Sequence, residues 1–384
     1  MAGLYVHIPF CASRCIYCGF YSTTGLNLQS SYIDAVIREL KLRRERQQEW
    51  HYEPWNTIYF GGGTPSTIPT PYLNRLISAI GDTFSNSDAA SLSDCRQIEW
   101  TMECNPDDIT PAFATWLNTT PINRISMGVQ TFNDERLHWL HRRHTSSQAQ
   151  RAVNMLREAG IRNISLDLMF GFPGQTLAEW NSDIEALLAL HPDHISAYSL
   201  MYEEGTPLYH MLKQGRINEI DEELSLQMYD TLIDRLTAAG YEHYEISNFA
   251  RPDFRSRHNS SYWNQTSYLG LGAAAHSYNG RQRWWNISDV RRYINDINCG
   301  ILPAEYEDID ETTHYNDIIT TALRTSDGID ITALPDPQRC YLLEQAEPHI
   351  QKKRLTLNAN RLCLTRQGIF TSDDIMSDLI LLAH

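Results

Sequence analysis

The sequence lacks the features that would anchor the chain in a membrane or export it from the cell. No apolar run is as long as the roughly 18 residues that a helix needs to span a bilayer. The residues before the first apolar segment contain neither the basic nor the hydrophobic region of a secretory signal. These absences predict a cytoplasmic protein with no transmembrane segment. Transient peripheral contact with a membrane stays compatible with them.

Positive charge is also scarce. The chain has 32 Lys and Arg residues against 47 Asp and Glu residues, which gives a formal net charge of -15. Nonspecific binding to nucleic acid depends on contacts between basic side chains and phosphate. The charge balance therefore argues against nucleic acid, and against anionic membrane surfaces, as partners.

Cysteine is sparse, with eight in 384 residues, which is too few for a disulfide scaffold. Three of the eight are clustered, because Cys11, Cys15 and Cys18 directly follow the apolar, strand-like run 4–10. Thiolates hold iron–sulfur clusters, and three of them can seat a 4Fe-4S cube that keeps one iron without a protein ligand. Metal-binding thiols must stay reduced, so the motif also predicts a reducing compartment.

Zinc is the alternative metal for this motif, since two cysteines at CxxC spacing are half of a structural zinc site. Such a site needs four nitrogen or sulfur ligands, and the sequence has no second CxxC or HxxxH pair. The remaining cysteines are scattered singly: Cys95, Cys104, Cys299, Cys340 and Cys363. A zinc-stabilised structural or interaction protein is therefore the weaker hypothesis.

The first half of the chain alternates between strand-like and helical patterns. The intervening segments show helical periodicity, as in Ala149, Ala152, Val153 and Leu156. This alternation predicts an α/β fold with a parallel sheet and right-handed crossovers. Polar residues gather at successive strand ends, which favours a barrel over an open sheet. The expected strands are 4–10, 57–60, 98–102, 124–129, 163–170 and 194–200.

The pattern changes after about residue 205. A helix through Leu224 and Leu236 is expected, then a strand at 241–248 and a polar, aromatic loop at 257–263. Beyond residue 302, helical runs and a hairpin at 355–364 predict a small, mostly helical, winged-helix-like module. The expected domains are a barrel at 1–215, an extension and linking segment at 216–302 and the C-terminal module at 303–384.

The spacing CxxxCxxC, with Tyr17 before the last cysteine, resembles the signature of the radical S-adenosylmethionine (radical SAM) enzymes. The resemblance implies a partial barrel of six βα units that binds a 4Fe-4S cluster and SAM. In those enzymes the amino and carboxylate groups of SAM occupy the fourth iron. The run 61–65, Gly-Gly-Gly-Thr-Pro, alone reads equally well as an ordinary βα turn, but it resembles the motif that holds the SAM amino group in these enzymes.

Within the superfamily, the chain resembles the oxygen-independent coproporphyrinogen oxidases and the HemW-type heme chaperones. Asp167 is notable on its own, because a carboxylate between two leucines in a strand is costly unless it is paired or faces a site. The resemblance implies that the following residues line the SAM site: Tyr5, Tyr17, Gly62, Gly63, Thr64, Glu103, Gln130, Arg142 and Asp167.

Two departures from the oxidase pattern favour the chaperone branch. Phe20 stands where the oxidases have a fourth cysteine, and the chain begins at the first strand without their N-terminal extension. The stretch 258–263, His-Asn-Ser-Ser-Tyr-Trp, resembles the heme-associated HNxxYW motif of the chaperones. His258 could be an axial ligand of heme iron, or simply a hydrogen-bonded loop residue between barrel and C-terminal module. His276 is a second candidate ligand.

The sequence therefore predicts a radical SAM heme chaperone that binds a 4Fe-4S cluster, SAM and heme. Its expected partners are heme and heme-accepting apo-proteins, such as respiratory enzymes. The alternative is a coproporphyrinogen III oxidase that uses a 5'-deoxyadenosyl radical for oxidative decarboxylation. No catalytic residue is assigned, and whether the chain is an enzyme stays open.

The cysteine motif generates a first prediction. Anaerobically purified protein should be brown and carry about four irons and four sulfides per chain, because three clustered thiolates suit an open cube. Replacement of Cys11, Cys15 and Cys18 by Ala should remove the iron, whereas Cys299→Ala should not. Elemental analysis that finds one zinc per chain and no iron after reconstitution would contradict the prediction.

Overall fold

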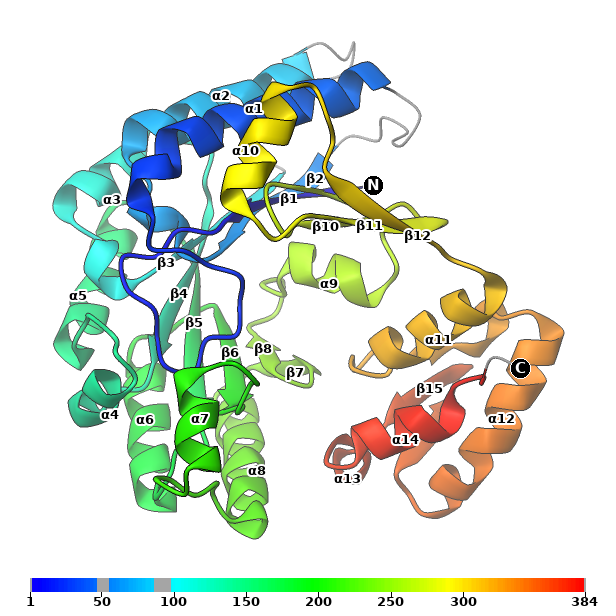
Figure 1. Cartoon of the computed structure of the whole chain (residues 1–384). Helices are drawn as coiled ribbons and strands as arrows, with labels where there is room; N and C mark the ends of the chain where they lie inside the picture. Colours follow the sequence, from blue (N-terminus) through cyan, green and yellow to red (C-terminus); the bar gives the residue numbers. More distant parts are fainter. Residues whose placement is uncertain (1, 47–54, 86–97, 383–384) are drawn as a thin grey trace.

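The computed structural model describes residues 2–46, 55–85 and 98–382, and Cys95 lies outside these ranges. One twelve-stranded sheet organises most of the chain, in the order β12-β11-β10-β9-β1-β2-β3-β4-β5-β6-β8-β7. Its centre consists of six parallel strands, which confirms the predicted α/β fold (Figure 1). These are β1 (Ala2–Ile8), β2 (Trp55–Gly62), β3 (Glu99–Cys104), β4 (Arg124–Gln130), β5 (Asn163–Phe170) and β6 (His194–Ser199).

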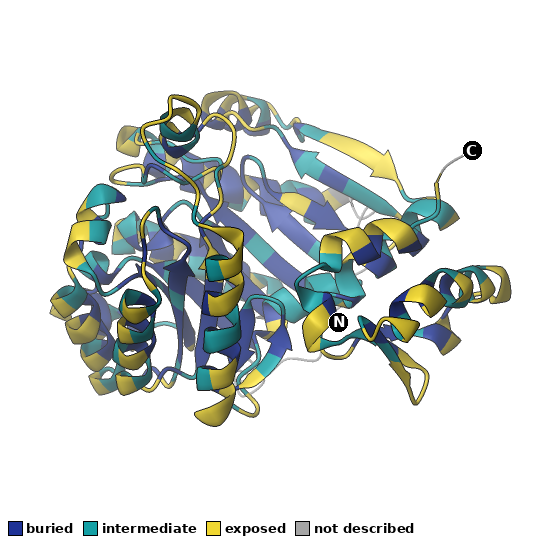
Figure 2. Cartoon of the chain, turned by 90° about the horizontal axis from the view of Figure 1, so that it is seen from below, coloured by how far each residue is buried: buried dark blue, intermediate teal, exposed yellow. Residues whose placement is uncertain are grey.

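The six parallel strands do not close into a barrel. β1 and β6 do not pair with each other. The sheet instead continues beyond β1 with β9 and beyond β6 with β8. Strand residues are buried on both faces, as expected for a parallel sheet that helices cover (Figure 2). Side chains such as Val6, Phe60 and Met127 belong to the main core. The fold is therefore a partial barrel of six βα units.

Helices follow the parallel strands and cover the outer face of the sheet (Figure 1). The predicted stripe of α5 is confirmed, because Ala149, Ala152, Val153 and Leu156 are all buried. Capping boxes at Thr145 and Thr176 begin α5 and α6. The helices are α1 (Gln29–Arg46), α2 (Thr70–Ser85), α3 (Pro111–Leu117), α4 (Asp134–Trp139), α5 (Ser146–Glu158), α6 (Leu177–Ala189), α7 (Pro207–Lys213) and α8 (Glu222–Ala238), with short 3₁₀ turns at Leu26–Leu28, Pro65–Thr67 and Pro106–Asp108.

The segment after α8 extends both edges of the sheet. The strand expected at 241–248 is instead a hairpin of β7 (Glu242–Glu245) and β8 (Asn248–Ala250), antiparallel to β6. At the other edge, β9 (Tyr268–Leu271) runs parallel to β1. The remaining elements of this edge are β10 (His276–Tyr278), β11 (Gln282–Asn286), α10 (Val290–Asn298) and β12 (Ala304–Asp308).

Two further expectations were wrong. The segment 257–263 is a helix, α9 (Arg257–Trp263), because Ser256 caps its N-terminus through a hydrogen bond from the Asn259 backbone N–H. The domain boundary expected between 302 and 303 falls too early, because β12 pairs with β11 of the large sheet along its whole length. The C-terminal module starts only after Asp308.

The C-terminal module has a hydrophobic core of its own, built around Tyr315, Ile319, Leu342 and Leu362. The predicted hairpin at 355–364 is confirmed, and it joins a small sheet in the order β13-β15-β14. The module consists of α11 (Glu311–Ala322), β13 (Ile329–Asp330), a 3₁₀ turn (Ile331–Ala333), α12 (Asp336–Gln351), β14 (Leu355–Asn358), β15 (Arg361–Leu364), α13 (Arg366–Ile369) and α14 (Ser372–Leu379).

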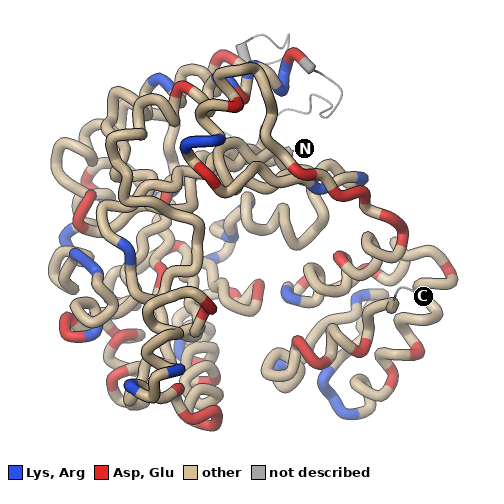
Figure 3. Tube along the Cα trace, in the orientation of Figure 1, with Lys and Arg blue, Asp and Glu red and all other residues tan. Residues whose placement is uncertain are grey.

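Ion pairs connect this module to the barrel. Arg366 contacts Asp234 of α8 at 2.6 Å, and Arg283 of β11 contacts Asp317 of α11 at 2.6 Å. Lys and Arg positions are spread along the trace of both parts of the chain in the view of Figure 3. None of the described helices is long and apolar enough to cross a membrane.

A buried charge cluster joins α1 to the extended edge of the sheet. Glu39 is fully buried and pairs with Arg43 at 2.8 Å. The same carboxylate accepts hydrogen bonds from the Gly272 backbone N–H, at 2.8 Å, and from Asn286 Nδ2, also at 2.8 Å. The Tyr293 hydroxyl donates to it as well. Glu39 therefore holds together β9, β11, α10 and α1.

This cluster generates a second prediction. Glu39→Ala should lower the free energy of unfolding by about 3–5 kcal/mol, because it leaves the buried Arg43 charge without its carboxylate. Urea unfolding followed by circular dichroism measures the change. The exposed Glu45 of the same helix is the matched control, and Glu45→Ala should change the stability by less than about 0.5 kcal/mol. Equal effects of the two substitutions would contradict this role of Glu39.

Candidate functional site

A cavity of about 620 Å³ opens at the carboxyl ends of the parallel strands. Each of the six parallel strands, or the segment that follows it, contributes residues to its lining, as expected for the ligand-binding face of a βα barrel. The structure brings eleven of the thirteen predicted site residues into this one cavity: Cys11, Cys15, Tyr17, Cys18, Gly62, Gly63, Thr64, Glu103, Gln130, Arg142 and Asp167.

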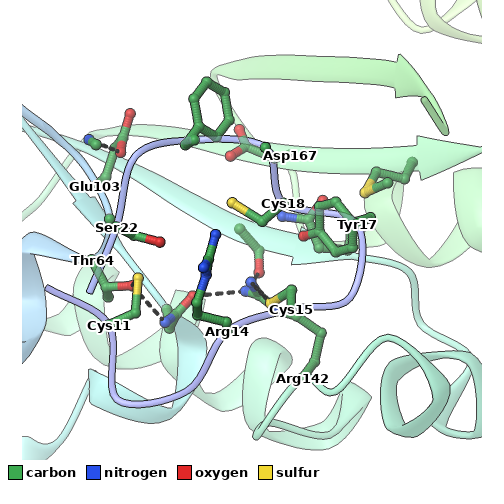
Figure 4. A pocket seen from close by; sticks show the side chains of 18 of the residues that line it. Cys11, Arg14, Cys15, Tyr17, Cys18, Ser22, Thr64, Glu103, Arg142 and Asp167 are labelled. Atoms are coloured by element: carbon green, nitrogen blue, oxygen red, sulfur yellow. Dashed lines mark hydrogen bonds between the residues drawn. The ribbon is translucent and has the colours of Figure 1, made fainter. Parts of the chain in front are cut away.

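The three clustered cysteines lie on the loop that joins β1 to α1 (Figure 4). All three are free thiols and are partly buried. Thr64 Oγ1 donates a hydrogen bond to Cys11 Sγ at 3.6 Å, and Arg142 Nη1 donates to Cys15 Sγ at 3.6 Å. Burial raises the pKa of the Cys11 and Cys18 thiols. The loop therefore presents three unpaired sulfur ligands to one cavity, with a cation beside one of them.

The described His, Cys, Asp and Glu side chains contain no group of three or more arranged to hold a single metal ion. A 4Fe-4S cube differs in this respect, because each thiolate binds a different iron. Three free thiols at the edge of a cavity of this size fit such a cluster with one iron facing the open space.

The glycine run at the end of β2 fits closely against the cysteine loop. The Gly63 backbone N–H donates to the Ile8 carbonyl at 2.8 Å. A Cβ atom at Gly63 would lie 2.9 Å from the carbonyl oxygens of Ile8 and Phe10, so only glycine permits this approach. Gly62 has φ +111°, which also favours glycine. The run thus places backbone groups directly beside the thiols.

Two carboxyl groups face the cavity from β3 and β5, which lie on either side of β4 in the sheet. Glu103 accepts hydrogen bonds from the Tyr59 hydroxyl at 2.7 Å and from the Gly62 N–H at 3.0 Å. Burial raises the pKa of Glu103. Among the described residues, Asp167 accepts one weak bond, from Ser126 Oγ at 3.4 Å. Burial, followed by the negative charge of Glu103, raises the pKa of Asp167 to about 7.

Gln130 reaches the cavity from the end of β4, and Arg142 reaches it from the segment after α4. Arg142 donates to Asn105 Oδ1 at 2.7 Å and to the Gly128 carbonyl, which connects its segment to the end of β3 and to β4. Gln130 has φ +71°, and the register of β4 against β5 shifts between Gly128 and Gln130. This local irregularity coincides with the entry of the Gln130 side chain into the cavity lining.

Two predicted residues lie outside the cavity. Tyr5 of β1 donates to His7 or accepts from it, at 3.0 Å from Nδ1. His258 is buried beneath α9, where its Nδ1 lies 2.8 Å from Thr57 Oγ1 and its Nε2 lies 2.9 Å from the Tyr262 hydroxyl. Its ring stacks on Tyr59 with centroids 4.9 Å apart. Burial lowers the pKa of His258 to about 3, so the ring is neutral.

Both ring nitrogens of His258 are therefore engaged, and iron could reach one only if a hydrogen bond broke. His276, the second candidate heme ligand, is exposed on β10 and stacks on Trp285. The structure brings neither histidine to the cavity that holds the cysteines.

Sequence reasoning missed several residues of the cavity. Asn105 directly follows β3, so its position at a strand end was a usable signal. The rim includes three exposed apolar side chains, Phe20 (72% exposed), Met201 (61%) and Tyr198 (40%). Nothing local in the sequence distinguishes Met201 or Tyr198, because only the fold brings them beside the cysteine loop.

Comparison with known proteins supports the resemblance seen in the sequence. The model of the radical SAM superfamily matches residues 5–187, and that of the HemN C-terminal domain matches residues 309–371. The heme chaperone HemW of Lactococcus lactis is 33% identical over 98% of this chain and 97% of its own length. The heme chaperone HemW of Bacillus subtilis is 36% identical over 82% of this chain and 80% of its own.

Among solved structures, the coproporphyrinogen III oxidase HemN of Escherichia coli superposes with a TM-score of 0.81. The match covers 99% of this chain and 90% of that enzyme, at 22% identity. At this identity the likeness shows the fold alone, including the C-terminal module.

The environment of Asp167 generates a third prediction. Its pKa in the folded state lies above the ordinary value, so folding strengthens proton binding and stability falls as the pH rises from about 4 to 7. Asp167→Asn removes this loss. In cluster-free protein, the variant should melt a few degrees above wild type at pH 8, with a smaller difference at pH 5.

Thermal unfolding at the two pH values measures the effect. Asp373→Asn, which changes an exposed carboxylate of α14, is the control and should show no such pH-dependent gain. A stabilisation by Asp167→Asn that is equal at both pH values would show that the Asp167 charge is not the cause.

Proposed function

We propose a function on the basis that the chain belongs to the radical SAM superfamily, in the family of the HemW heme chaperones. The protein binds a 4Fe-4S cluster, SAM and heme, and it transfers heme to acceptor proteins. The observation that carries this proposal is the match to HemW proteins at 30–33% identity over 98% of the chain.

Cys11, Cys15 and Cys18 are the proposed ligands of the cluster. Their support is geometric, since the three free thiols line one cavity and leave its interior open. Arg142 beside Cys15, and Thr64 beside Cys11, would stabilise the negative charge of the thiolates. When bound, the cluster supplies the electron for reductive chemistry on SAM.

The proposed SAM site is the rest of the same cavity. SAM carries a positive sulfonium, an amino group and a carboxylate. Glu103 and Asp167 provide negative charge, and Arg142 provides the positive partner for a carboxylate. The sharp turn at Gly62 and Gly63 exposes backbone groups that could accept a bond from the amino group. Tyr17 and Gln130 complete the lining, and Tyr5 supports it from behind through its contacts with Tyr59 and His258.

The residues divide between three structural parts. The barrel, residues 1–215, holds the cluster and SAM, while 216–308 extends the sheet and carries α9. The C-terminal module follows from residue 309. We place the protein in the cytoplasm because its cluster ligands must stay reduced. Heme-accepting respiratory apo-proteins are the proposed clients, and a brief encounter at the membrane surface is compatible with this role.

Heme transfer from the protein provides the test and the fourth prediction. Anaerobic protein with cluster and SAM is loaded with heme and mixed with the heme-free form of a respiratory enzyme from the same host. Activity of the acceptor should return faster than with free heme at the same concentration. The Cys11, Cys15 and Cys18 triple Ala variant, loaded with the same heme, should transfer it more slowly.

A parallel incubation addresses the oxidase function. Coproporphyrinogen III, SAM and a reductant are added, and protoporphyrinogen IX should stay at the level of a sample without protein. Turnover that depends on the three cysteines, together with no heme transfer, would replace the chaperone proposal by an oxidase.

A further inference from the structure

A second cavity, of about 710 Å³, lies between α9 and the C-terminal module. Its volume is within the range of roughly 300–1,000 Å³ that is usual for small-molecule and cofactor sites. It shares no lining residue with the cysteine cavity. α9 borders both cavities, because Asn259 lines the first whereas Ser260, Trp263 and Asn264 line the second. Figure 1 shows α9 between the large sheet and the C-terminal module. We call this second cavity the α9 cleft.

The α9 cleft has a broad apolar component. Trp263 contributes an aromatic ring from α9, and its shielded indole Nε1 has no hydrogen-bond partner among the residues that the structure describes. Ile318 and Ala322 contribute from α11, and Ile329 and Leu334 from the segment after it. A flat apolar ligand could bury a large area here, at about 25 cal/mol per Å² of apolar surface.

His314 is the unusual polar residue of the α9 cleft. It lies one turn before Ile318 and two turns before Thr321 and Ala322, so all four line the cleft from the same face of α11. Its Nδ1 is shielded from solvent and has no hydrogen-bond partner in the described part of the chain. A shielded ring nitrogen without a partner is unfavourable unless a ligand completes it.

Charged groups lie among the lining residues as well. Arg255 pairs with Asp327 at 3.3 Å and with Glu242 at 3.1 Å, and Arg361 pairs with Asp330 at 3.4 Å. These arginines are 37% and 50% exposed, so their ion pairs are weak and exchangeable. An incoming carboxylate could share or replace an aspartate, because arginine binds carboxylates through several N–H groups.

We propose that the α9 cleft is the heme site and that His314 is the ligand of the heme iron. The inference rests on the proposed function, which it deepens by naming the place and the ligand. Heme combines a flat apolar macrocycle, two carboxylates and an iron that binds a neutral imidazole. In the cleft, Trp263 and aliphatic side chains would contact the macrocycle. Arg255 and Arg361 would pair with the carboxylates, and His314 would bind the iron.

Two other side chains compete for the iron. His258 would have to break a hydrogen bond to Thr57 or Tyr262 and leave a fully buried position. Cys363 also lines the α9 cleft, but its thiol donates to the Ser326 carbonyl at 3.6 Å, and burial raises its pKa, which disfavours the thiolate that binds iron. His314 would have to turn its shielded Nδ1 toward the cleft, but this nitrogen has no hydrogen bond to break among the described residues.

Heme titration of the full-length protein with its cluster in place tests this fifth prediction. In His314→Ala the Soret band should shift, and the dissociation constant for heme should rise about tenfold or more. Added imidazole should restore the wild-type Soret position in this variant, because it can occupy the space of the missing ring. His210→Ala, which removes an exposed histidine of α7, is the matched control and should leave band and affinity unchanged.

A second variant blocks the space rather than the ligand. Ala333 is exposed and lines the α9 cleft, so Ala333→Trp should fill part of it without disturbing a core. Heme affinity should fall, whereas the change that SAM causes in the electron paramagnetic resonance spectrum of the reduced cluster should persist. That persistence shows that the variant is folded.

The opposite results would contradict either the assignment of the heme site or the chaperone proposal. Wild-type spectrum and affinity in His314→Ala, with an altered spectrum in His258→Gln or Cys363→Ser, would assign the iron to that residue and refute this inference, while the chaperone proposal stands. Unchanged heme binding in both His314→Ala and Ala333→Trp would place heme elsewhere. Wild-type protein that binds heme no better than a control protein would refute the chaperone proposal itself.

Discussion

The parallel pairing of β1 with β2 is the constraint on which the site depends. Six residues of β1 pair with β2 in one unbroken register, from Gly3 opposite Thr57 to Ile8 opposite Gly62. Because the strands run the same way, the cysteine loop and the glycine run leave the sheet at the same edge. The same geometry brings the ends of β3, β4 and β5, with Glu103, Gln130 and Asp167, to that edge. A shift in this register would separate the thiols from the glycine run.

α9 is the second organising element, and its position is strongly determined. Glu99 of β3 accepts the backbone N–H groups of Arg257 and His258, at 3.1 Å and 3.0 Å, so a carboxylate caps the positive end of the helix. His258 adds a side-chain bond to Thr57 of β2. The helix is thereby fixed to the sheet with one side at each cavity. The hydrogen bonds of His258 therefore hold α9 in place, whereas His314 of α11 has an Nδ1 atom without a partner among the described residues.

Much of the fold and of the cysteine cavity could be predicted from the sequence, for identifiable reasons. Buried parallel strands such as β5 are rich in apolar residues, and the candidate cofactor ligands follow strands as short local motifs. β12 escaped prediction because an exposed edge strand, Ala304–Asp308, is acidic rather than apolar. α9 escaped because its polar composition resembles a loop, although Ser256 was an available N-cap signal. The α9 cleft combines residues such as Trp263, His314 and Arg361 that only tertiary packing brings together.

The central claim is that one chain holds SAM with its cluster in one cavity and heme in another. Titration of SAM into protein already saturated with heme tests this most directly, with the cluster followed by electron paramagnetic resonance and the heme by its Soret band. Two separate cavities predict that SAM perturbs the cluster signal at the same concentration with and without heme, while heme stays bound. Displacement of heme by SAM, or an apparent SAM affinity that falls in proportion to added heme, would show a single shared site and contradict the account.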